Sequence, residues 1–321
     1  MTRSLGHLDA QECLTLYNRG YGIGEIGSLR GYSYTGMRKL LLRNGARFRN
    51  KQEAYKVMLS RRPEWKRQFL RYTVSDESRK LSISKIKLLF FVFTEGCIYK
   101  SKIQFTNNEG VLHRDFSKLM KEVYNADTKT RGKVTYVFST EIADDLRAYS
   151  LKRKIPENVL DKLLESPQLT RDILRIFADT EGSVTISVRR APRNYTVVDR
   201  RVVISCTNPI VRSQLIVLLN SLGIEAGDRK DTIQIMEESS LREFALQVSF
   251  SPGVRVVRKK AGHGVWYMHE KSTLLRLLIR VYDEQKAKGR RGRHEGVFRT
   301  CTKKEDVMCI LNSWYDELKG G

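Results

Sequence analysis

Two stretches of the sequence end in the same three residues: residues 88–96 read LLFFVFTEG, and residues 174–182 read LRIFADTEG. Each stretch is an apolar run of helical character that finishes on Thr-Glu-Gly. Helices more often finish on basic residues, because the helix dipole makes the C-terminal end negative. The carboxylates of Glu95 and Glu181 are therefore unusual in these positions. We expect the glycine after each glutamate to supply the left-handed conformation of a sharp turn from helix to strand.

The residues that follow these stretches form an internal repeat. After Gly96 the sequence predicts two short strands that end in FTNN and a helix VLHRDFSKLMKEVY. After Gly182 it predicts two strands that end in SCTN and a helix PIVRSQLIVLLNSLG. Further on, residues 134–149 and 231–246 each read as a strand followed by a capped amphipathic helix. Each copy is thus predicted to run helix, strand, strand, helix, strand, strand, helix, and the fold class is α+β.

The composition indicates a globular protein with a polyanionic partner. The chain has 321 residues, 40% of them hydrophobic, and a formal net charge of +23. A surplus of lysine and arginine this large points to nucleic acid first and to an anionic membrane surface second.

The sequence also suggests a compartment. No apolar run approaches the roughly 20 residues of a membrane span, and the start lacks the apolar core of a signal peptide. The five cysteines form no CxxC pair, which argues against metal fingers and disulfides and for a reducing cytosol. We expect a cytoplasmic protein, associated with the nucleoid if the host is prokaryotic, and no membrane partner.

The first 50 residues contain three short helical patterns separated by breaks that contain glycine. Two short helices around a glycine-containing turn are typical of a helix-turn-helix. The stretch LYNRGYGIGEIGSLRGYSYTGMRKLL (16–41) resembles the helix-turn-helix of resolvase-like and regulator proteins, although Gly27 stands where that family usually has alanine. Ser33 is predicted to cap the third helix.

The exposed face of this third helix offers side chains for base edges or phosphates in the major groove. The alternative is a three-helix bundle with a solvated basic face. The side chains predicted to bind DNA are Tyr34, Thr35, Arg38 and Lys39.

The two repeats resemble the two halves of a single-chain LAGLIDADG homing endonuclease. The nine-residue signature of that family aligns with LLFFVFTEG and LRIFADTEG, and the resemblance covers residues 81–285. It implies that the signature helices pack side by side along a pseudo-two-fold axis and that two four-stranded sheets form a saddle over DNA. It also implies that one chain acts as a pseudo-dimer. The sequence departs from the family at signature positions two and three, which favour small residues and here hold Leu89, Phe90, Arg175 and Ile176.

The resemblance places Glu95 and Glu181 at the bases of the signature helices, beside the minor groove, as catalytic and metal-binding residues. Two carboxylates brought together at helix C-termini oppose the dipoles and repel each other. Mg²⁺ or another divalent cation removes both penalties, and it binds carboxylates together with phosphate and water. The alternative is a solvated glutamate at each helix end. Asp179 has no acidic counterpart in the first copy and is interpreted as a capping or structural acid.

The resemblance further implies a lysine near the scissile phosphates, after the third helix of each half. Lys154, in LKRKIPENVL (151–160), and Lys271, in HEKSTLLRLL (269–278), occupy comparable places. As catalytic residues they would polarise the water network or stabilise charge on the phosphorane. The alternative for each is an ordinary surface lysine in a basic chain.

Strands that face DNA should alternate between the core and the groove. The hairpin after the second signature is longer than the one after the first, so the second half is expected to reach further along the groove. In the second copy the alternation assigns to the groove side Thr185, Ser187, Arg189 and Arg201.

Two basic runs, residues 254–260 and 286–294, are expected to contact phosphates, which adds affinity but little specificity. The alternative for the second run is a solvated loop.

The sequence therefore predicts a Mg²⁺-dependent, site-specific DNA endonuclease that makes a double-strand break across the minor groove. The alternative is a non-cleaving DNA-binding regulator or an RNA-splicing cofactor on the same scaffold. The predicted segments are a helix-turn-helix domain (1–50), a basic helical connector (51–80), the first repeat (81–164), the second repeat (165–285) and a basic loop with a C-terminal helix (286–321).

Overall fold

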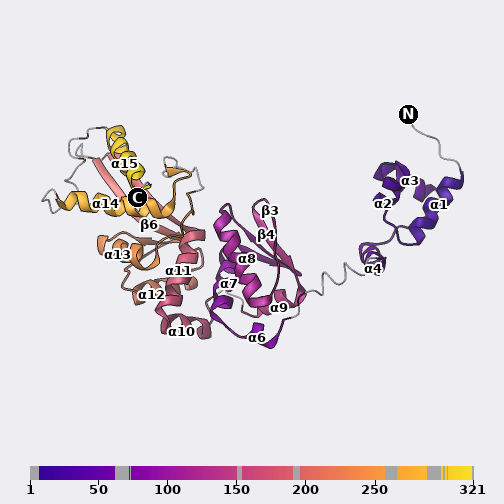
Figure 1. The fold of residues 1–321 in the computed structure, drawn as a ribbon, viewed down its shortest axis with the longest axis horizontal. Coiled ribbons are helices and arrows are strands. Elements are labelled where there is room, and N and C mark those ends of the chain that lie inside the picture. The colour runs from indigo at the N-terminus through magenta and orange to yellow at the C-terminus, as the bar shows by residue number, and fades with distance from the viewer. Residues whose placement is uncertain are drawn as a thin grey trace. The chain divides into compact units, whose positions relative to one another are not determined.

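The chain forms two units, residues 1–71 and 72–321, and each is described by itself. In this computed structural model, drawn in Figure 1, the described residues are 7–61, 72, 74–149, 154–190, 196–256, 266–287, 298, 301 and 303–319.

The first unit is helical as far as it is described. Ser33 caps α3, as the sequence predicts: its hydroxyl oxygen accepts a hydrogen bond from Gly36 N at 3.1 Å. Gly31 ends α2 with a φ of 73°, a conformation that favours glycine. Met37 and Leu41 of α3 are fully buried against Ile26 of α2. The helices are α1 (His7–Asn18), α2 (Ile23–Arg30), α3 (Tyr34–Arg43) and α4 (Lys51–Arg61).

Helix α4 packs with the first unit, although the sequence places its residues in a connector. The guanidinium of Arg61 lies 3.4 Å from the centre of the Tyr21 ring and pairs with the Glu25 carboxylate at 3.3 Å. In the structure α4 thus belongs to the first unit, and the second unit begins at Tyr72, while the predicted segment bounds stay a prediction.

The second unit contains the two predicted repeats, and the α+β fold class is confirmed. Each repeat has one antiparallel four-stranded sheet, in the orders β1-β2-β4-β3 (sheet A) and β5-β6-β8-β7 (sheet B). The first repeat contains α7 (Ile83–Thr94), β1 (Gly96–Tyr99), β2 (Lys102–Thr106), α8 (Gly110–Tyr124), β3 (Lys129–Arg131), β4 (Val134–Phe138) and α9 (Thr140–Ala148). The second contains α11 (Pro167–Glu181), β5 (Gly182–Arg190), β6 (Thr196–Ser205), α12 (Pro209–Ser221), β7 (Gly227–Arg229), β8 (Thr232–Ile235), α13 (Glu238–Glu243) and the π-helical η1 (Phe244–Val248).

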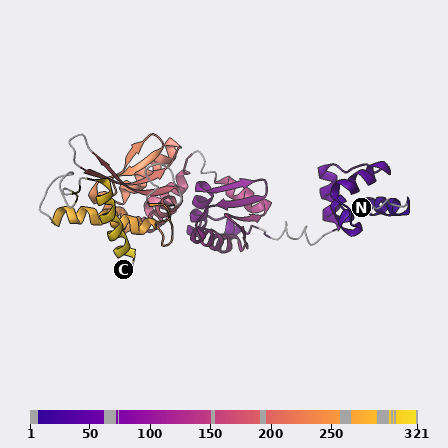
Figure 2. The ribbon, with the colours of Figure 1, turned by 90° about the horizontal axis from the view of Figure 1, so that it is seen from above.

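Four further helices belong to the second unit. Helix α6 precedes the first repeat, and α10 joins the two repeats. Helices α14 and α15 pack on each other and on β5, and in the view from above they lie, in yellow, with the second repeat (Figure 2). Their bounds are α6 (Asp76–Arg79), α10 (Glu157–Glu165), α14 (Lys271–Ala287) and α15 (Lys304–Lys319).

Helices α7 and α11 pack side by side, and one apolar core runs through both repeats. Large side chains fill the contact: the Phe177 ring lies 5.8 Å from Phe90 and 5.7 Å from Phe93, between ring centres. Lys87 and Asp172 form an ion pair across the pair of helices at 2.7 Å. The aromatic side chains of Phe90, Phe93 and Phe177 thus fill the contact between the two helices.

The structure requires glycine at positions 96 and 182 for a different reason from the predicted one. Gly182 is extended, with φ −88° and ψ 157°, and neither glycine has a positive φ. A Cβ on Gly96 would lie 2.4 Å from the Val92 Cα, and one on Gly182 would lie 2.4 Å from the Ala178 carbonyl oxygen. Each strand leaves its helix so closely that only glycine fits, so close approach, and not left-handed backbone, fixes the residue type.

Gly27 makes a similar close approach in the first unit, and this yields a prediction. A Cβ there would lie 2.8 Å from the Tyr32 carbonyl oxygen. Gly27→Ala is expected to destabilise the α2–α3 turn by about 1–3 kcal/mol, because overpacking forces the backbone to shift. Hydrogen exchange of the α2 and α3 amides measures the effect.

Gly24→Ala, in the same helix, is the matched control. Its Cβ would meet no atom closer than 3.9 Å, so the gain in helix propensity of about 1 kcal/mol should dominate. Equal amide protection in the two variants would contradict the close approach at Gly27.

Candidate metal centre and nucleic-acid interface

The two predicted acids end the two paired helices in the same local geometry. Glu95 follows the last residue of α7, and Glu181 is the last residue of α11. The preceding threonine folds back on its helix in both copies: Thr94 Oγ1 donates to Phe90 O at 3.1 Å, and Thr180 Oγ1 donates to Ile176 O at 2.7 Å. Both glutamates are partly exposed.

Lys271, the first residue of α14, lies at the C-terminal end of α11. It is only 6% exposed, and its Nζ donates to Asp179 O at 2.7 Å and to Ala178 O at 3.3 Å. Burial lowers the pKa of Lys271 to about 8, against the charges of Asp179, Glu109, Glu181 and Glu95, which raise it. A buried ammonium thus supplies positive charge at the C-terminal end of α11, where the dipole is negative. The reading of Lys271 as an ordinary surface lysine is wrong.

Asp179 has a structural hydrogen bond, in line with its interpretation as a structural acid. Its carboxylate accepts from Ser251 N at 2.9 Å and is 4% exposed. Burial raises the pKa of Asp179, while the bond to Ser251 and the charges of Lys271 and Arg175 lower it. Asp179 therefore anchors the segment after η1 to the end of α11.

Glu109 joins this group from the first repeat, and sequence reasoning missed it. It is the N-cap residue of α8, and burial raises its pKa while Arg255 and Lys271 lower it. Its carboxylate belongs to the first repeat and interacts with the charges of Arg255 and Lys271. Nothing in the local sequence TNNEG relates position 109 to position 271, so no sequence pattern could have revealed the contact.

The structure does not bring Lys154 to this centre. Its side chain is 56% exposed, and Nζ pairs with Glu157 at 3.2 Å at the start of α10. Helix α10 leads into the N-terminal end of α11, which is 15 residues long and spans about 22 Å. Lys154 thus lies with the end of α11 opposite to Glu181, and its catalytic role stays a prediction.

Glu95 and Glu181 can bind a divalent cation only if another molecule supplies further oxygen ligands. Within the described ranges, no group of three His, Cys, Asp or Glu side chains is arranged to hold a metal ion. Glu95 and Glu181 offer carboxylate oxygens, which Mg²⁺ uses in ones and twos beside phosphate and water. The residues present therefore fit a cation that is completed by a nucleic-acid phosphate.

In sheet B the predicted alternation is observed, but the groove side is more covered than expected. Val202 and Ile204 are buried, whereas Arg201 is half-buried on the other face. Thr185, the cross-strand partner of Arg201, is only 6% exposed. Ser187 is half-buried, and the side chain of Arg189 lies outside the described part of the structure.

Sheet A presents a face that sequence reasoning did not single out. Alternation buries Ile103 and Val137 and turns their neighbours outward. Tyr99 is 66% exposed and Phe138 is 40% exposed. The ammonium of Lys102 lies 5.0 Å from the Tyr136 ring, a cation–π contact. The outward face also carries Gln104, Lys129 and Arg131.

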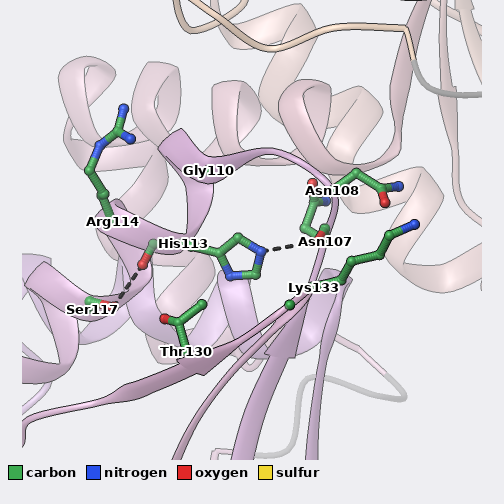
Figure 3. Close-up of a pocket in the computed structure, with 9 residues that line it drawn as sticks. Asn107, Asn108, Gly110, His113, Arg114, Ser117, Thr130 and Lys133 are labelled. Carbon is green, nitrogen blue, oxygen red and sulfur yellow. Dashed lines mark hydrogen bonds between the residues drawn. The ribbon is translucent and has the colours of Figure 1, made fainter.

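A pocket of about 460 Å³ opens where β2 meets α8 and the β3–β4 turn (Figure 3). His113 Nε2 donates to Asn107 O at 3.0 Å, so its Nδ1 accepts from the Thr135 hydroxyl at 2.8 Å. Exposed Arg114 and Lys133 line the mouth of the pocket. Thr106, which precedes the pocket residues, donates its N–H to Glu95 O. Arg114 and Lys133 therefore lie at the end of sheet A that holds Glu95.

The four predicted side chains of α3, Tyr34, Thr35, Arg38 and Lys39, are all exposed, and the Arg38 guanidinium lies 5.2 Å from the Phe48 ring. Of the two basic runs, residues 257–260 and 288–294 lie outside the described residues. None of the helices that the structure describes is both long and apolar enough to span a membrane.

The sequence matches no protein-family model and no curated protein. Among solved structures it is similar to the LAGLIDADG meganuclease I-AabMI bound to uncleaved DNA, at 12% identity over 72% of this chain and 97% of that chain, with a TM-score of 0.41. It is similar to I-DmoI in complex with DNA and Mn, at 14% identity over 54% of this chain and 97% of that chain, with a TM-score of 0.35. It is also similar to the N-terminal LAGLIDADG domain of DUF199/WhiA, at 16% identity over 59% and 92%, with a TM-score of 0.36. These are similarities of fold at low identity.

The place of Lys271 yields a stability prediction. Lys271→Met keeps the length of the side chain but leaves two helix-end carbonyls and several carboxylates without their cation. We expect the free energy of unfolding to fall by about 3 kcal/mol, the scale for breaking a buried charge interaction. Urea unfolding followed by tryptophan fluorescence, to which the buried Trp266 contributes, measures it.

Lys154→Met is the matched control. This lysine is exposed, and its loss should change the free energy of unfolding by less than about 0.5 kcal/mol. Equal stability of the Lys271→Met and Lys154→Met variants would contradict the role given to Lys271.

Proposed function

We propose that the chain is a site-specific, divalent-metal-dependent DNA endonuclease. One observation carries the proposal: Glu95 and Glu181 end two helices that pack side by side, and each follows a threonine that bonds back to its helix in the same way. The net charge of +23 supports a polyanionic substrate. Because both acids belong to one chain, we propose that it acts as a monomer with two pseudo-equivalent halves.

In the proposed reaction, the two glutamates and Lys271 have different roles. Glu95 and Glu181 would hold Mg²⁺ or another divalent cation together with a DNA phosphate. When bound, such a cation supplies an activated water and stabilises the attacking and leaving oxygens of the phosphodiester. Lys271 bonds the carbonyls of α11 behind the acids, so it holds the helix end in place and is a positioning residue.

The DNA-contacting surfaces follow from the exposed faces. Sheet A offers Lys102, Gln104 and Tyr136, and Arg114 and Lys133 of the neighbouring pocket suit backbone phosphates. Sheet B offers Ser187 and Arg201, with the predicted contacts Thr185 and Arg189. In the first unit, Tyr34, Thr35, Arg38 and Lys39 suit the major groove.

A specific observation favours a second candidate, a DNA-binding regulator that does not cleave. The sequence argument for a metal rests on the cost of placing carboxylates at helix C-termini. Lys271 already offsets part of that cost with a protein cation. Glu95 and Glu181 are therefore also compatible with a protein that binds DNA without cleaving its phosphodiesters.

Strand-resolved cleavage decides between the two. A cognate duplex is first selected from a randomised pool with the wild-type chain. In Mg²⁺, Glu181→Gln keeps the side-chain shape but removes the charge, so cleavage of one strand should fall at least about 100-fold while DNA binding persists or tightens. Glu95→Gln should do the same to the other strand and leave nicked product.

Glu109→Gln is the matched control, because Glu109 also faces Lys271 but lies at the start of a helix. It should retain cleavage. Full activity of both single variants would refute the roles of Glu95 and Glu181. A wild type that binds one site tightly in Mg²⁺ without cutting it would support the regulator.

A further inference from the structure

Helix α15 lies outside the two repeats and packs on the second one. It contacts α14 and β5, and Arg280 of α14 pairs with Glu317 of α15 at 2.7 Å. Three side chains spaced four residues apart on α15 are buried, and such a spacing places them on one face of the helix. They are Val307, Leu311 and Tyr315. The buried face of α15 therefore ends, towards the C-terminus, in a tyrosine that carries a hydroxyl group.

The Tyr315 hydroxyl is bonded to the residue that precedes α14. Glu270 N donates to the Tyr315 hydroxyl at 3.0 Å, and the His269 and Tyr315 rings lie 4.5 Å apart between their centres. Tyr315 is only 5% exposed, so little water competes for this bond. Because Lys271 directly follows Glu270, the bond fixes the backbone at the first residue of α14.

Glu270 also joins the start of α14 to the segment that follows η1. Its carboxylate accepts from Gly253 N at 2.9 Å and from Ser272 Oγ at 2.9 Å. Lys271 N donates to Val254 O at 2.9 Å, so the two stretches of backbone lie along each other. The Tyr315 hydroxyl thus bonds to a residue that ties two segments together.

Both segments reach the end of α11. Lys271 Nζ donates to Asp179 O at 2.7 Å, and Ser251 N donates to the Asp179 carboxylate at 2.9 Å. Asp179 lies in the last turn of α11, which ends at Glu181. A displaced start of α14 would therefore move the donors that hold this turn. The contacts lead from Tyr315 to the helix turn that carries Glu181.

We propose that Tyr315 is a positioning residue for Glu181. Its hydroxyl fixes the start of α14, so Lys271 keeps its place on the last carbonyls of α11 and Glu181 keeps its direction towards a bound phosphate. Because Tyr315 is buried, it acts through Lys271 and not by contact with DNA. The inference rests on the proposed function and adds to it a residue outside both repeats. Small displacements of a reacting group lower rates strongly, which makes the effect measurable.

Strand-resolved cleavage of the selected duplex in Mg²⁺ tests this role. Tyr315→Phe removes only the hydroxyl, and we expect it to slow single-turnover cleavage of one strand by about ten-fold. That strand is the one whose cleavage depends on Glu181, as identified with Glu181→Gln. Cleavage of the other strand and duplex affinity should not change. A loss of folded protein would instead slow both strands equally.

Tyr282→Phe is the matched control. It also removes a buried-face hydroxyl of the second unit, one that donates to Met236 O at 3.2 Å, away from the end of α11. This variant should cleave both strands at the wild-type rate.

Amide hydrogen exchange of the free protein tests the same contact without cleavage. Gly182 N donates to Ala178 O at the end of α11. Tyr315→Phe should speed exchange of the Lys271 and Gly182 amides by about ten-fold, because local opening becomes easier when a tie is lost. Tyr282→Phe should leave both amides at the wild-type rate.

The two measurements separate the possible failures. Unchanged exchange at Gly182, or equal slowing of both strands by Tyr315→Phe, would overturn the inference while the proposed function stands. A wild type that binds its selected duplex but cuts neither strand would overturn the proposed function, and with it any role of Tyr315 in cleavage. Exchange at Gly182 would then still decide whether Tyr315 holds the end of α11.

Discussion

The hydrogen bonds from the Lys271 ammonium to the last carbonyls of α11 are the contact on which the centre of the second unit depends. A charge buried to this degree is stable only with close partners, and Lys271 has both carbonyl acceptors and surrounding carboxylates. The contact fixes the start of α14 against the end of α11. Asp179 fixes the segment after η1 at the same place through Ser251. The end of α11, which carries Glu181, is therefore held by two other parts of the chain.

The repeat could be predicted from the sequence because its signals are local. Apolar runs, alternating strands and capping residues give the order of elements in both copies, and Ser33 gives the start of α3. The surroundings of the acids could not be predicted, because they depend on contacts distant in sequence. Lys271 lies 90 residues from Glu181 in a stretch that reads as an ordinary helix start, and Glu109 lies in the other repeat.

For some residues the structure gives a physical reason or an exposure that differs from the sequence-based expectation. Gly96 and Gly182 were expected as left-handed turns, but the close approach of strand to helix excludes any Cβ. Thr185 lies on the expected face of β5, yet it is only 6% exposed. Alternation predicts which way a side chain turns, whereas its exposure depends on the size of its neighbours across the sheet.

The two repeats are alike in backbone and unlike in surface. Sheet A carries exposed Tyr99 and Phe138 beside lysines, whereas sheet B has a longer hairpin with hydroxyl groups and Arg201. Helices α14 and α15 pack on β5 of the second repeat, whereas Tyr72, at the start of the second unit, bonds to Asp127 of the first repeat. In the proposed function, the two repeats would thus present different chemistry to the two halves of a duplex, which suits a target without symmetry.

The central claim is that Glu95 and Glu181 form one metal centre. Crystals of the chain on its selected duplex, grown with Mn²⁺ as an anomalous scatterer, test it most directly. The account predicts anomalous density at the meeting point of α7 and α11, with carboxylate oxygens of both glutamates at about 2.0–2.6 Å and a DNA phosphate oxygen completing the site. Well-ordered glutamates that face the duplex with no metal density between them, and Lys271 as the only cation at the helix ends, would contradict it.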